Sequence, residues 1–188
     1  MKDHVRKFDF DDLLITPAAI SKVTSRKTVN FFDENGMLPL FTAPMDTVVD
    51  IRHRKIFSEN LIYPIIPRTQ TRFFTEEDYL NVNDWIALSL DQFERLLISA
   101  EPGLTDQPLR ILIDIANGHM QRLLDVIIQA KSGGNNRWSL MVGNVANPQT
   151  FFELSKAGAD FVRVGVGNGA GCSTSVHTGI GYPLASLI

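Results

Sequence analysis

The sequence has little of what marks secreted, membrane-spanning or nucleic-acid-binding proteins. Its single cysteine, Cys172, excludes an internal disulfide framework. No apolar run approaches the roughly 20 residues that span a bilayer, and the opening MKDHVRKFDFDD lacks the apolar core of a secretory signal. A net charge of −3 provides no basic field for nucleic acid or an anionic membrane. We therefore expect a cytoplasmic protein without nucleic-acid or membrane partners.

Short apolar runs alternate with helical patterns along the 188 residues, of which 44% are hydrophobic, as in an ordinary globular domain. The runs are nearly continuous rather than alternating, which is typical of parallel strands buried on both faces. They predict six strands, at residues 38–43, 61–66, 84–90, 110–115, 138–142 and 160–166.

The segments between these runs carry helix signals. Asp91 with Glu94 predicts a capping box, and residues 147–158 open with Asn-Pro and close at a glycine, which predicts a second helix. A third helix, over 119–130, would place on one face Met120, Leu123, Leu124, Ile127 and Ile128. Strands alternating with helices predict a parallel sheet of right-handed βαβ units. This leaves two architectures, an open doubly wound sheet and a closed eightfold barrel.

The length matters to this choice, because a complete eightfold barrel takes about 250 residues. Only six strands are predicted here, and the last residues, 181–188, read as the start of a further helix. We therefore expect the chain to be part of a larger protein.

Polar residues and glycines gather at the predicted ends of four strands. In parallel α/β folds, ligands bind at the carboxyl ends of the strands. These ends contain Pro44–Thr47, Asp114–His119, Gly143–Asn144 and Gly165–Thr174. We expect them to share one rim of the sheet and to form the functional site.

The last of these loops has glycines at 165, 167, 169 and 171, directly before Cys172. Alternating glycines allow positive φ and let backbone groups approach a ligand or ion closely. A loop thiol becomes a useful nucleophile where neighbouring amides lower its pKa. The loop residues alone leave open a flexible glycine loop with an incidental cysteine.

Several stretches together resemble the IMP dehydrogenase/GMP reductase family over nearly the whole chain. They are FDDLLI at 10–15 with Ser25-Arg26, APMDTV at 43–48, Asp114 with Gly143–Val145, and GVGNGAGCST at 165–174 with TGIGYP at 178–183. The resemblance implies a (β/α)8 TIM barrel, of which residues 1–188 would supply the N-terminal part, with about six strand–helix units and no regulatory insert domain.

The resemblance also implies roles for the matching residues. Cys172 would attack C2 of a purine nucleotide, IMP or GMP, and a hydride would pass between C2 and NAD(H) or NADP(H). Thr174 would assist the group that enters or leaves at C2. The substrate would contact Met45, Asn144, Gly169 and Ala170, and the cofactor would contact Asp114, Ala116, Asn117, Gly118 and Arg163. Carbonyls that would hold a monovalent cation, K⁺, belong to Gly167, Gly169 and Cys172. The family also implies a homo-oligomer, a tetramer.

The chain departs from the family pattern at several of these positions. Ala170 replaces the serine that commonly binds the substrate phosphate, and Asn168 and Gly171 replace a proline and a bulky residue. Ser175 stands where reductases carry an arginine, and residues 65–69 replace a histidine-containing basic segment, so no cofactor-contacting lysine is assigned. Phosphate binding and the exact substrate are the properties that these changes put in question.

The choice within the family rests on spacing. IMP dehydrogenases usually carry a regulatory domain after the second strand's helix, and residues 71–84 leave no room for one. Residues 114–118 and 181–183 are also closer to GMP reductases, which favours NADPH-dependent conversion of GMP to IMP and ammonia. An IMP dehydrogenase without the insert, converting IMP to XMP with NAD, stays open. So does a non-catalytic nucleotide-binding or assembly fragment that needs a partner chain.

Each residue also has a plainer interpretation. Met45 could be a core side chain, Asp114 could cap the next helix, and Asn144 could serve only the loop amides. Arg163 could lie on the surface, and Asp46-Thr47 could be a helix N-cap. The four histidines lack the spacing of a metal site, and only His119 lies near the predicted rim.

Overall fold

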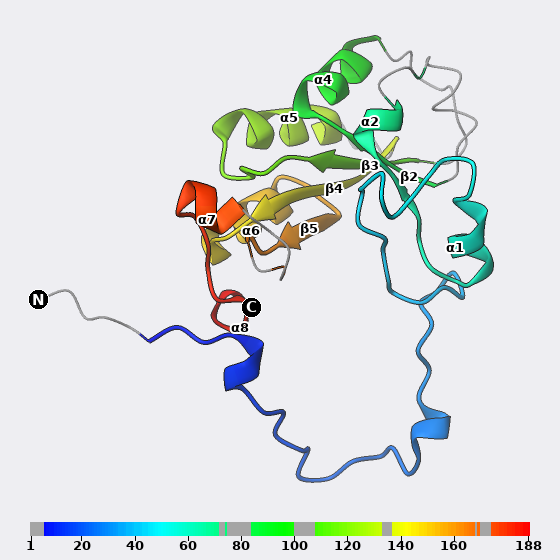
Figure 1. The fold of residues 1–188 in the computed structure, drawn as a ribbon, viewed down its shortest axis with the longest axis vertical. Coiled ribbons are helices and arrows are strands. Elements are labelled where there is room, and N and C mark those ends of the chain that lie inside the picture. Colours follow the sequence, from blue (N-terminus) through cyan, green and yellow to red (C-terminus); the bar gives the residue numbers. More distant parts are fainter. Residues whose placement is uncertain are drawn as a thin grey trace, which may run out of the picture.

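The computed structural model describes residues 6–71, 74, 84–99, 108–132, 137–167, 169 and 174–188. Five parallel strands form one sheet (Figure 1): β1 (Ile65–Ile66), β2 (Trp85–Leu88), β3 (Leu109–Asp114), β4 (Trp138–Val145) and β5 (Phe161–Val164). Their order in the sheet is the order in the chain. A doubly wound sheet reverses its strand order at a switch point, so the unbroken order is that of a barrel wall.

The first predicted strand, 38–43, is wrong in extent, because only a parallel bridge between Phe41 and Tyr63 forms there. The second predicted strand is reduced to the two residues of β1. The Oγ1 of Thr42 accepts the Ile65 N–H at 2.9 Å and so takes the place of a backbone carbonyl. Leu61 has a positive φ of 61°, which also interrupts extended pairing at this end of the wall.

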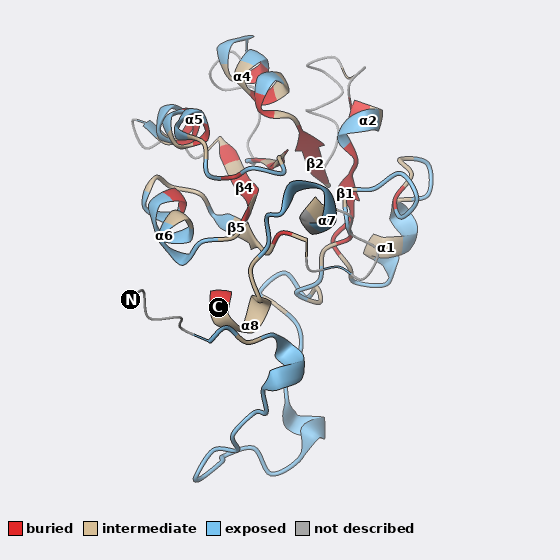
Figure 2. Cartoon of the chain, turned by 60° about the vertical axis from the view of Figure 1, so that its left-hand side comes forward, coloured by how far each residue is buried: buried red, intermediate tan, exposed pale blue. Residues whose placement is uncertain are grey.

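Side chains alternate between the two faces of the sheet. Ile86, Ile111, Leu140 and Val162 belong to the outer layer, under α4 (Leu90–Ser99), α5 (Gln121–Lys131) and α6 (Pro148–Lys156). The inner face carries a second cluster, made up of Tyr63, Ile65, Trp85, Ala87, Leu112 and Met141. In Figure 2 the buried strands lie inside an arc of these helices. This two-sided burial explains the continuous apolar runs in the sequence.

The predicted helices are present, but two details differ. Ser89 and Gln92 form the capping box of α4, each side chain bonding the other's backbone N–H at 3.2 and 2.7 Å, so Asp91 and Glu94 are not the box. Ile128 is 51% exposed, whereas the buried residues of α5 are Leu123, Val126, Ile127 and Ala130. The start of α6 is as predicted: the Asn147 side chain accepts from the Gln149 N–H at 2.8 Å.

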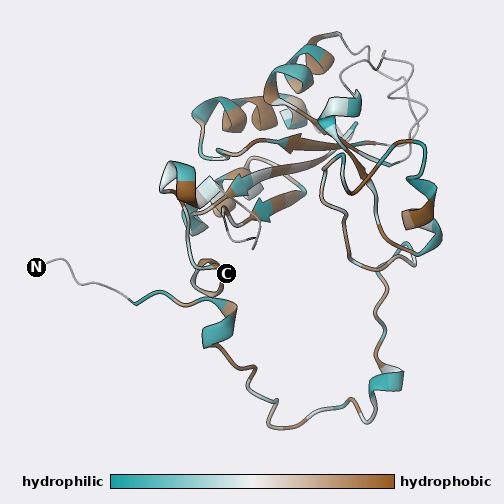
Figure 3. Ribbon diagram, in the orientation of Figure 1, coloured by the Kyte–Doolittle hydropathy of each residue, from teal (hydrophilic) through white to brown (hydrophobic). Residues whose placement is uncertain are grey.

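The remaining elements are short: η1 (Phe10–Asp12), η2 (Arg26–Thr28), α1 (Lys55–Glu59), α2 (Arg68–Thr71), α7 (Thr174–Thr178) and α8 (Leu184–Leu187). The N-terminal segment, with η1 and η2, runs outside the body of the molecule (Figure 1). Coloured by hydropathy (Figure 3), it mixes apolar and polar residues, while the strands are mostly apolar. Across the described ranges, no helix is long and apolar enough to cross a membrane.

Candidate functional site

The strand register brings three predicted site residues together. Asp114, the last residue of β3, pairs with Gly143 of β4, and Gly143 pairs with Arg163 of β5. Paired residues of neighbouring strands point to the same face. Val162 and Val164 pack against the outer cluster, so Arg163, between them, lies on the inner face. Asp114 and Gly143 therefore share the inner face with Arg163, at the carboxyl rim.

Asp114 lies between two arginines at this rim. Arg163 Nη1 donates to Asp114 Oδ1 at 2.7 Å, and the two side chains are about a quarter exposed. Arg68 is at the start of α2. Its Nε lies 3.9 Å from Asp114 Oδ2, and its Nη1 donates to the Asp114 carbonyl at 3.4 Å. Asp114 is not a helix cap, because α5 begins after Met120 with no side-chain cap. The Arg163 side chain is partly buried in its ion pair with Asp114.

Arg68 is the rim residue that the sequence interpretation missed. The family pattern gives Arg68 no role, because it lies in the segment that lacks the family's lysine. Its side chain is half exposed, with a relative accessibility of 51%, and carries a positive charge at the carboxyl end of β1. A signal was present in the sequence, since an arginine directly after a buried strand lies where ligands bind in this fold.

The end of β4 is shaped by glycine. Gly143 has a φ of +134°, and a Cβ there would lie 2.6 Å from the Arg163 carbonyl oxygen. The β4–β5 register shifts between Gly143 and Val145, which leaves Asn144 at a β-bulge. The Asn144 side chain donates to the Gly165 carbonyl at 2.8 Å. Asn144 therefore binds a backbone carbonyl at the start of the glycine loop, rather than the loop's backbone N–H groups.

The loop after β3 packs against this bulge. Gly118 is buried, and a Cβ on it would lie 2.6 Å from the Asn144 carbonyl oxygen, so its lack of a side chain serves close packing. Ala116 and Asn117 are exposed on the rim. His119 Nε2 accepts the Ala146 N–H at 3.0 Å, and its Nδ1 lies 2.9 Å from Thr150 Oγ1. Since Nε2 accepts from a backbone N–H, this geometry assigns the ring proton to Nδ1.

Met45 lies in a turn beyond the Phe41 bridge and is 54% exposed, so it is not a core side chain. The next residue, Asp46, accepts from Thr69 Oγ1 at 2.6 Å and from Gln70 Nε2 at 3.0 Å. These bonds fasten the turn to α2. Asp46 and Thr47 do not cap a helix, because the next one is α1, starting at Lys55.

The glycine loop is described in part. Gly165 and Gly167 have φ values of 108° and 77°, which are backbone conformations that glycine adopts more easily than other residues. Gly169 is exposed, and Thr174 is the first, partly buried residue of α7. Cys172, Ala170, Asn168, Gly171 and Ser173 lie outside the described residues. Their predicted roles, and the third carbonyl of the cation site, stay predictions.

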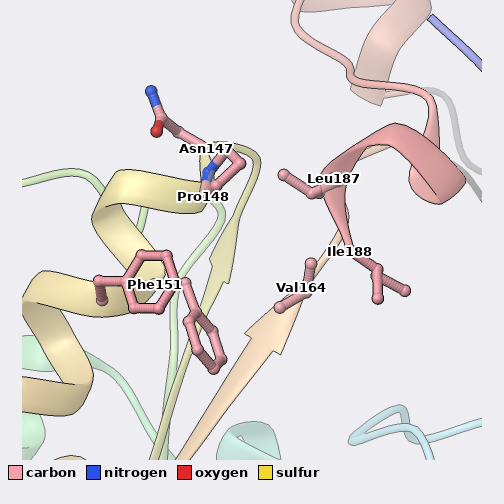
Figure 4. Close-up of a pocket in the computed structure, with 7 residues that line it drawn as sticks. Asn147, Pro148, Phe151, Val164, Leu187 and Ile188 are labelled. Atoms are coloured by element: carbon pink, nitrogen blue, oxygen red, sulfur yellow. The ribbon is translucent and has the colours of Figure 1, made fainter.

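Two cavities lie outside the cluster of Asp114, Arg68 and Arg163. One of about 170 Å³ lies between α6 and the end of the chain, where Phe151 and Val164 approach Leu187 and Ile188 (Figure 4). A larger one, of about 520 Å³, lies at the amino ends of the strands, beside Trp85, Arg110 and Phe161. Within the described part of the chain, no three His, Cys, Asp or Glu side chains are grouped to hold a metal ion.

The sequence model of the "IMP dehydrogenase / GMP reductase domain" matches residues 7–188. The chain belongs to this family. A GMP reductase of Vibrio cholerae is 29% identical over 197 residues, covering 97% of the chain and 56% of the relative. A GMP reductase of Bacillus cereus is 31% identical over 192 residues, covering 96% and 58%. The chain spans about half the length of the curated relatives it matches.

A solved structure supports the fold. The inosine 5′-monophosphate dehydrogenase of Legionella pneumophila superposes with a TM-score of 0.68 at 23% identity, covering 95% of the chain and 56% of that structure. The predicted TIM-barrel architecture is thereby confirmed, as a partial barrel. Among the described residues, its five-stranded sheet is not closed by hydrogen bonds.

Proposed function

We propose that the protein is a purine-nucleotide oxidoreductase, a GMP reductase that converts GMP to IMP and ammonia with NADPH. The observation that carries the proposal is the alignment of nearly the whole chain with proteins named GMP reductase. The meeting of Asp114, Asn144 and Arg163 at one rim supports it, because ligands of this fold bind at that end of the strands.

The covalent work is assigned to Cys172. Its thiolate forms a bond to C2 of the purine, and the C2–amino bond then breaks, so that ammonia leaves after protonation. Hydride enters at C2, the sulfur–carbon bond breaks, and the thiolate returns. Thr174, two residues further along, hydrogen-bonds the departing nitrogen. Met45 and Asn144 border the purine.

The rim residues fit a nicotinamide nucleotide. Asp114 offers a partly exposed carboxylate, a ribose acceptor, beside the exposed Ala116 and Asn117. When bound, the nicotinamide supplies the hydride. Arg68 and Arg163 carry two positive charges against the one negative charge of Asp114, and the excess favours an anionic ligand. A monovalent cation held by Gly167, Gly169 and Cys172 and a homotetramer remain parts of the proposal.

The test is an activity scan with Cys172→Ser as the key variant. GMP with NADPH should be consumed, with IMP and ammonia as products, and Cys172→Ser should reduce turnover at least about 10³-fold while nucleotide binding persists. Thr174→Val should slow loss of the amino group without preventing adduct formation. A C2-reactive purine analogue should add one mass equivalent to the intact protein, in competition with GMP. Full turnover by Cys172→Ser would exclude the mechanism.

Two other outcomes would redirect the proposal. Conversion of IMP to XMP with NAD would make the protein an IMP dehydrogenase without a regulatory domain, as the solved dehydrogenase of the same fold suggests. Nucleotide binding without turnover until a second chain is added would identify a fragment that needs a partner.

A further inference from the structure

Residues 7–9, near the start of the chain, are hydrogen-bonded to residues 182–186, near its end. Phe8 and Ser186 form a reciprocal pair: the Phe8 N–H donates to Ser186 Oγ at 2.6 Å, and the Ser186 N–H donates to the Phe8 carbonyl at 3.0 Å. Figure 1 shows η1, which begins two residues after Phe8, lying beside α8. We call this contact the N-terminal clasp, formed by Lys7, Phe8 and Asp9 with Tyr182, Leu184 and Ser186.

Two further contacts complete the clasp. Asp9 Oδ1 accepts both from the Phe10 N–H at 3.1 Å and from the Leu184 N–H at 3.3 Å, so one carboxylate serves the first residue of η1 and the first residue of α8. Lys7 Nζ donates to Tyr182 Oη and lies 4.8 Å from the centre of the Tyr182 ring. Three consecutive residues thus engage one short stretch of chain about 175 positions away.

The clasped stretch leads back to the proposed catalytic residues. Residues 182–186 follow α7, whose first residue is Thr174. Between them, Gly179 has a φ of +67°, and a Cβ there would meet no atom within 4 Å. This joint is therefore unpacked and turns through a conformation that favours glycine. Beyond the joint, Leu187 of α8 is buried at the cavity beside α6, and the clasp binds residues 182–186, which lie between the joint and Leu187.

We propose that Asp9 and Ser186 are positioning residues, which hold the segment that begins at Thr174 in register with the rim. This rests on the proposed function. None of the clasp's described bonds reaches Asp114, Asn144 or Arg163, so we expect its effect on the rate of the chemical step rather than on substrate affinity. Misplacement of a reacting group by about 1 Å can slow a reaction by about 100-fold.

The chain offers closely matched variants. Asp9→Ala removes the acceptor for the Leu184 N–H, whereas Asp9→Asn retains an isosteric acceptor. Ser186→Ala removes the bond from the Phe8 N–H but leaves the reverse bond intact. Asp12→Ala is the control, because Asp12 Oδ2 accepts from the Asp9 N–H at 2.9 Å within η1 and makes no described bond to residues 182–186.

The experiment has two readouts. Asp9→Ala and Ser186→Ala should lower kcat by about 10-fold or more, with KM for GMP within about twofold, while Asp9→Asn and Asp12→Ala stay close to the parent. Cys172 is the sole cysteine, so its iodoacetamide alkylation can be followed by intact mass without nucleotide. That rate should change by about threefold or more in Asp9→Ala and Ser186→Ala alone.

The two proposals fail separately. If the parent protein turns over neither GMP nor IMP, the proposed function fails. The alkylation rates of Cys172 still test the clasp proposal in that case. If Asp12→Ala matches Asp9→Ala in both readouts, the effect belongs to folding of the N-terminal segment and the clasp proposal is wrong. Unchanged kcat and alkylation in Ser186→Ala, the variant least able to disturb folding, would also overturn it.

Discussion

At their amino ends the strands present aromatic rings to the inside of the barrel, whereas at their carboxyl ends they present charge and glycine. Phe161 packs edge-on against both Phe41 and Trp85, with ring centres 5.8 and 5.5 Å apart. At the carboxyl rim of the same sheet, Asp114 and Arg163 form an ion pair. Aromatic packing fixes one end by apolar contact, and the other end is held by directional polar bonds. Side-chain changes at the rim that leave the backbone in place should therefore affect ligands, and changes among the amino-end rings should affect stability without affecting ligands.

The largest expected effect is that of Gly143→Ala at the rim. A Cβ there would lie 2.6 Å from the Arg163 carbonyl oxygen, at a φ of +134°, so the β4–β5 pairing must shift. We expect unfolding to become easier by about 3 kcal/mol and turnover to be lost. Gly36→Ala is the matched control: it also has a positive φ, of +74°, but meets no atom within 4 Å. Urea denaturation measures both, and equal losses would show that φ alone, not crowding at the rim, is responsible.

Asp114→Asn should separate binding from stability. The amide is isosteric with the carboxylate but weakens the bonds to Arg163 and to a ribose hydroxyl. We expect KM for the nicotinamide nucleotide to rise by about 10-fold, with a loss of stability under about 1 kcal/mol because the pair is partly solvated. Its control is Asp91→Asn, which weakens the exposed Asp91–Arg122 pair on the outer helices. A rise in KM in both variants, or in neither, would contradict a cofactor role for Asp114.

Much of this organisation could be predicted from the sequence, because it depends on local patterns. Continuous apolar runs identified the buried strands, and polar residues at their ends identified the rim. The contact between Arg68 and Asp114 could not be predicted, because it depends on how the wall curves between β1 and β3. Nor could the shortness of the first strand, since Thr42 uses its side chain where the pattern implies backbone pairing.

The cap of α4 shows the same limit at a smaller scale. Both Ser89–Gln92 and Asp91–Glu94 have the spacing of a capping box, and a pattern of spacing does not distinguish them. The structure uses Ser89, which leaves the Asp91 and Glu94 carboxylates to bind Arg122 of α5. A tertiary partner therefore decides what a local motif does.

The smallest effect is expected from Tyr63→Phe, at the aromatic end. The Tyr63 hydroxyl donates to Asp33 Oδ2 at 2.5 Å, and this bond lowers the pKa of the Asp33 carboxyl. Loss of one partly buried hydrogen bond should lower Tm by about 2–4 °C near neutral pH, with kcat and KM unchanged. The bond stabilises the fold fully above the ordinary carboxyl pKa of 3.8, and the stabilisation is lost as pH falls through the lowered value. The Tm difference between parent and variant should therefore shrink below about pH 4. A Tm difference that stayed constant into acid would assign the effect to packing of the ring rather than to the carboxylate. Any change in KM would show that the amino end of the sheet also affects ligand binding.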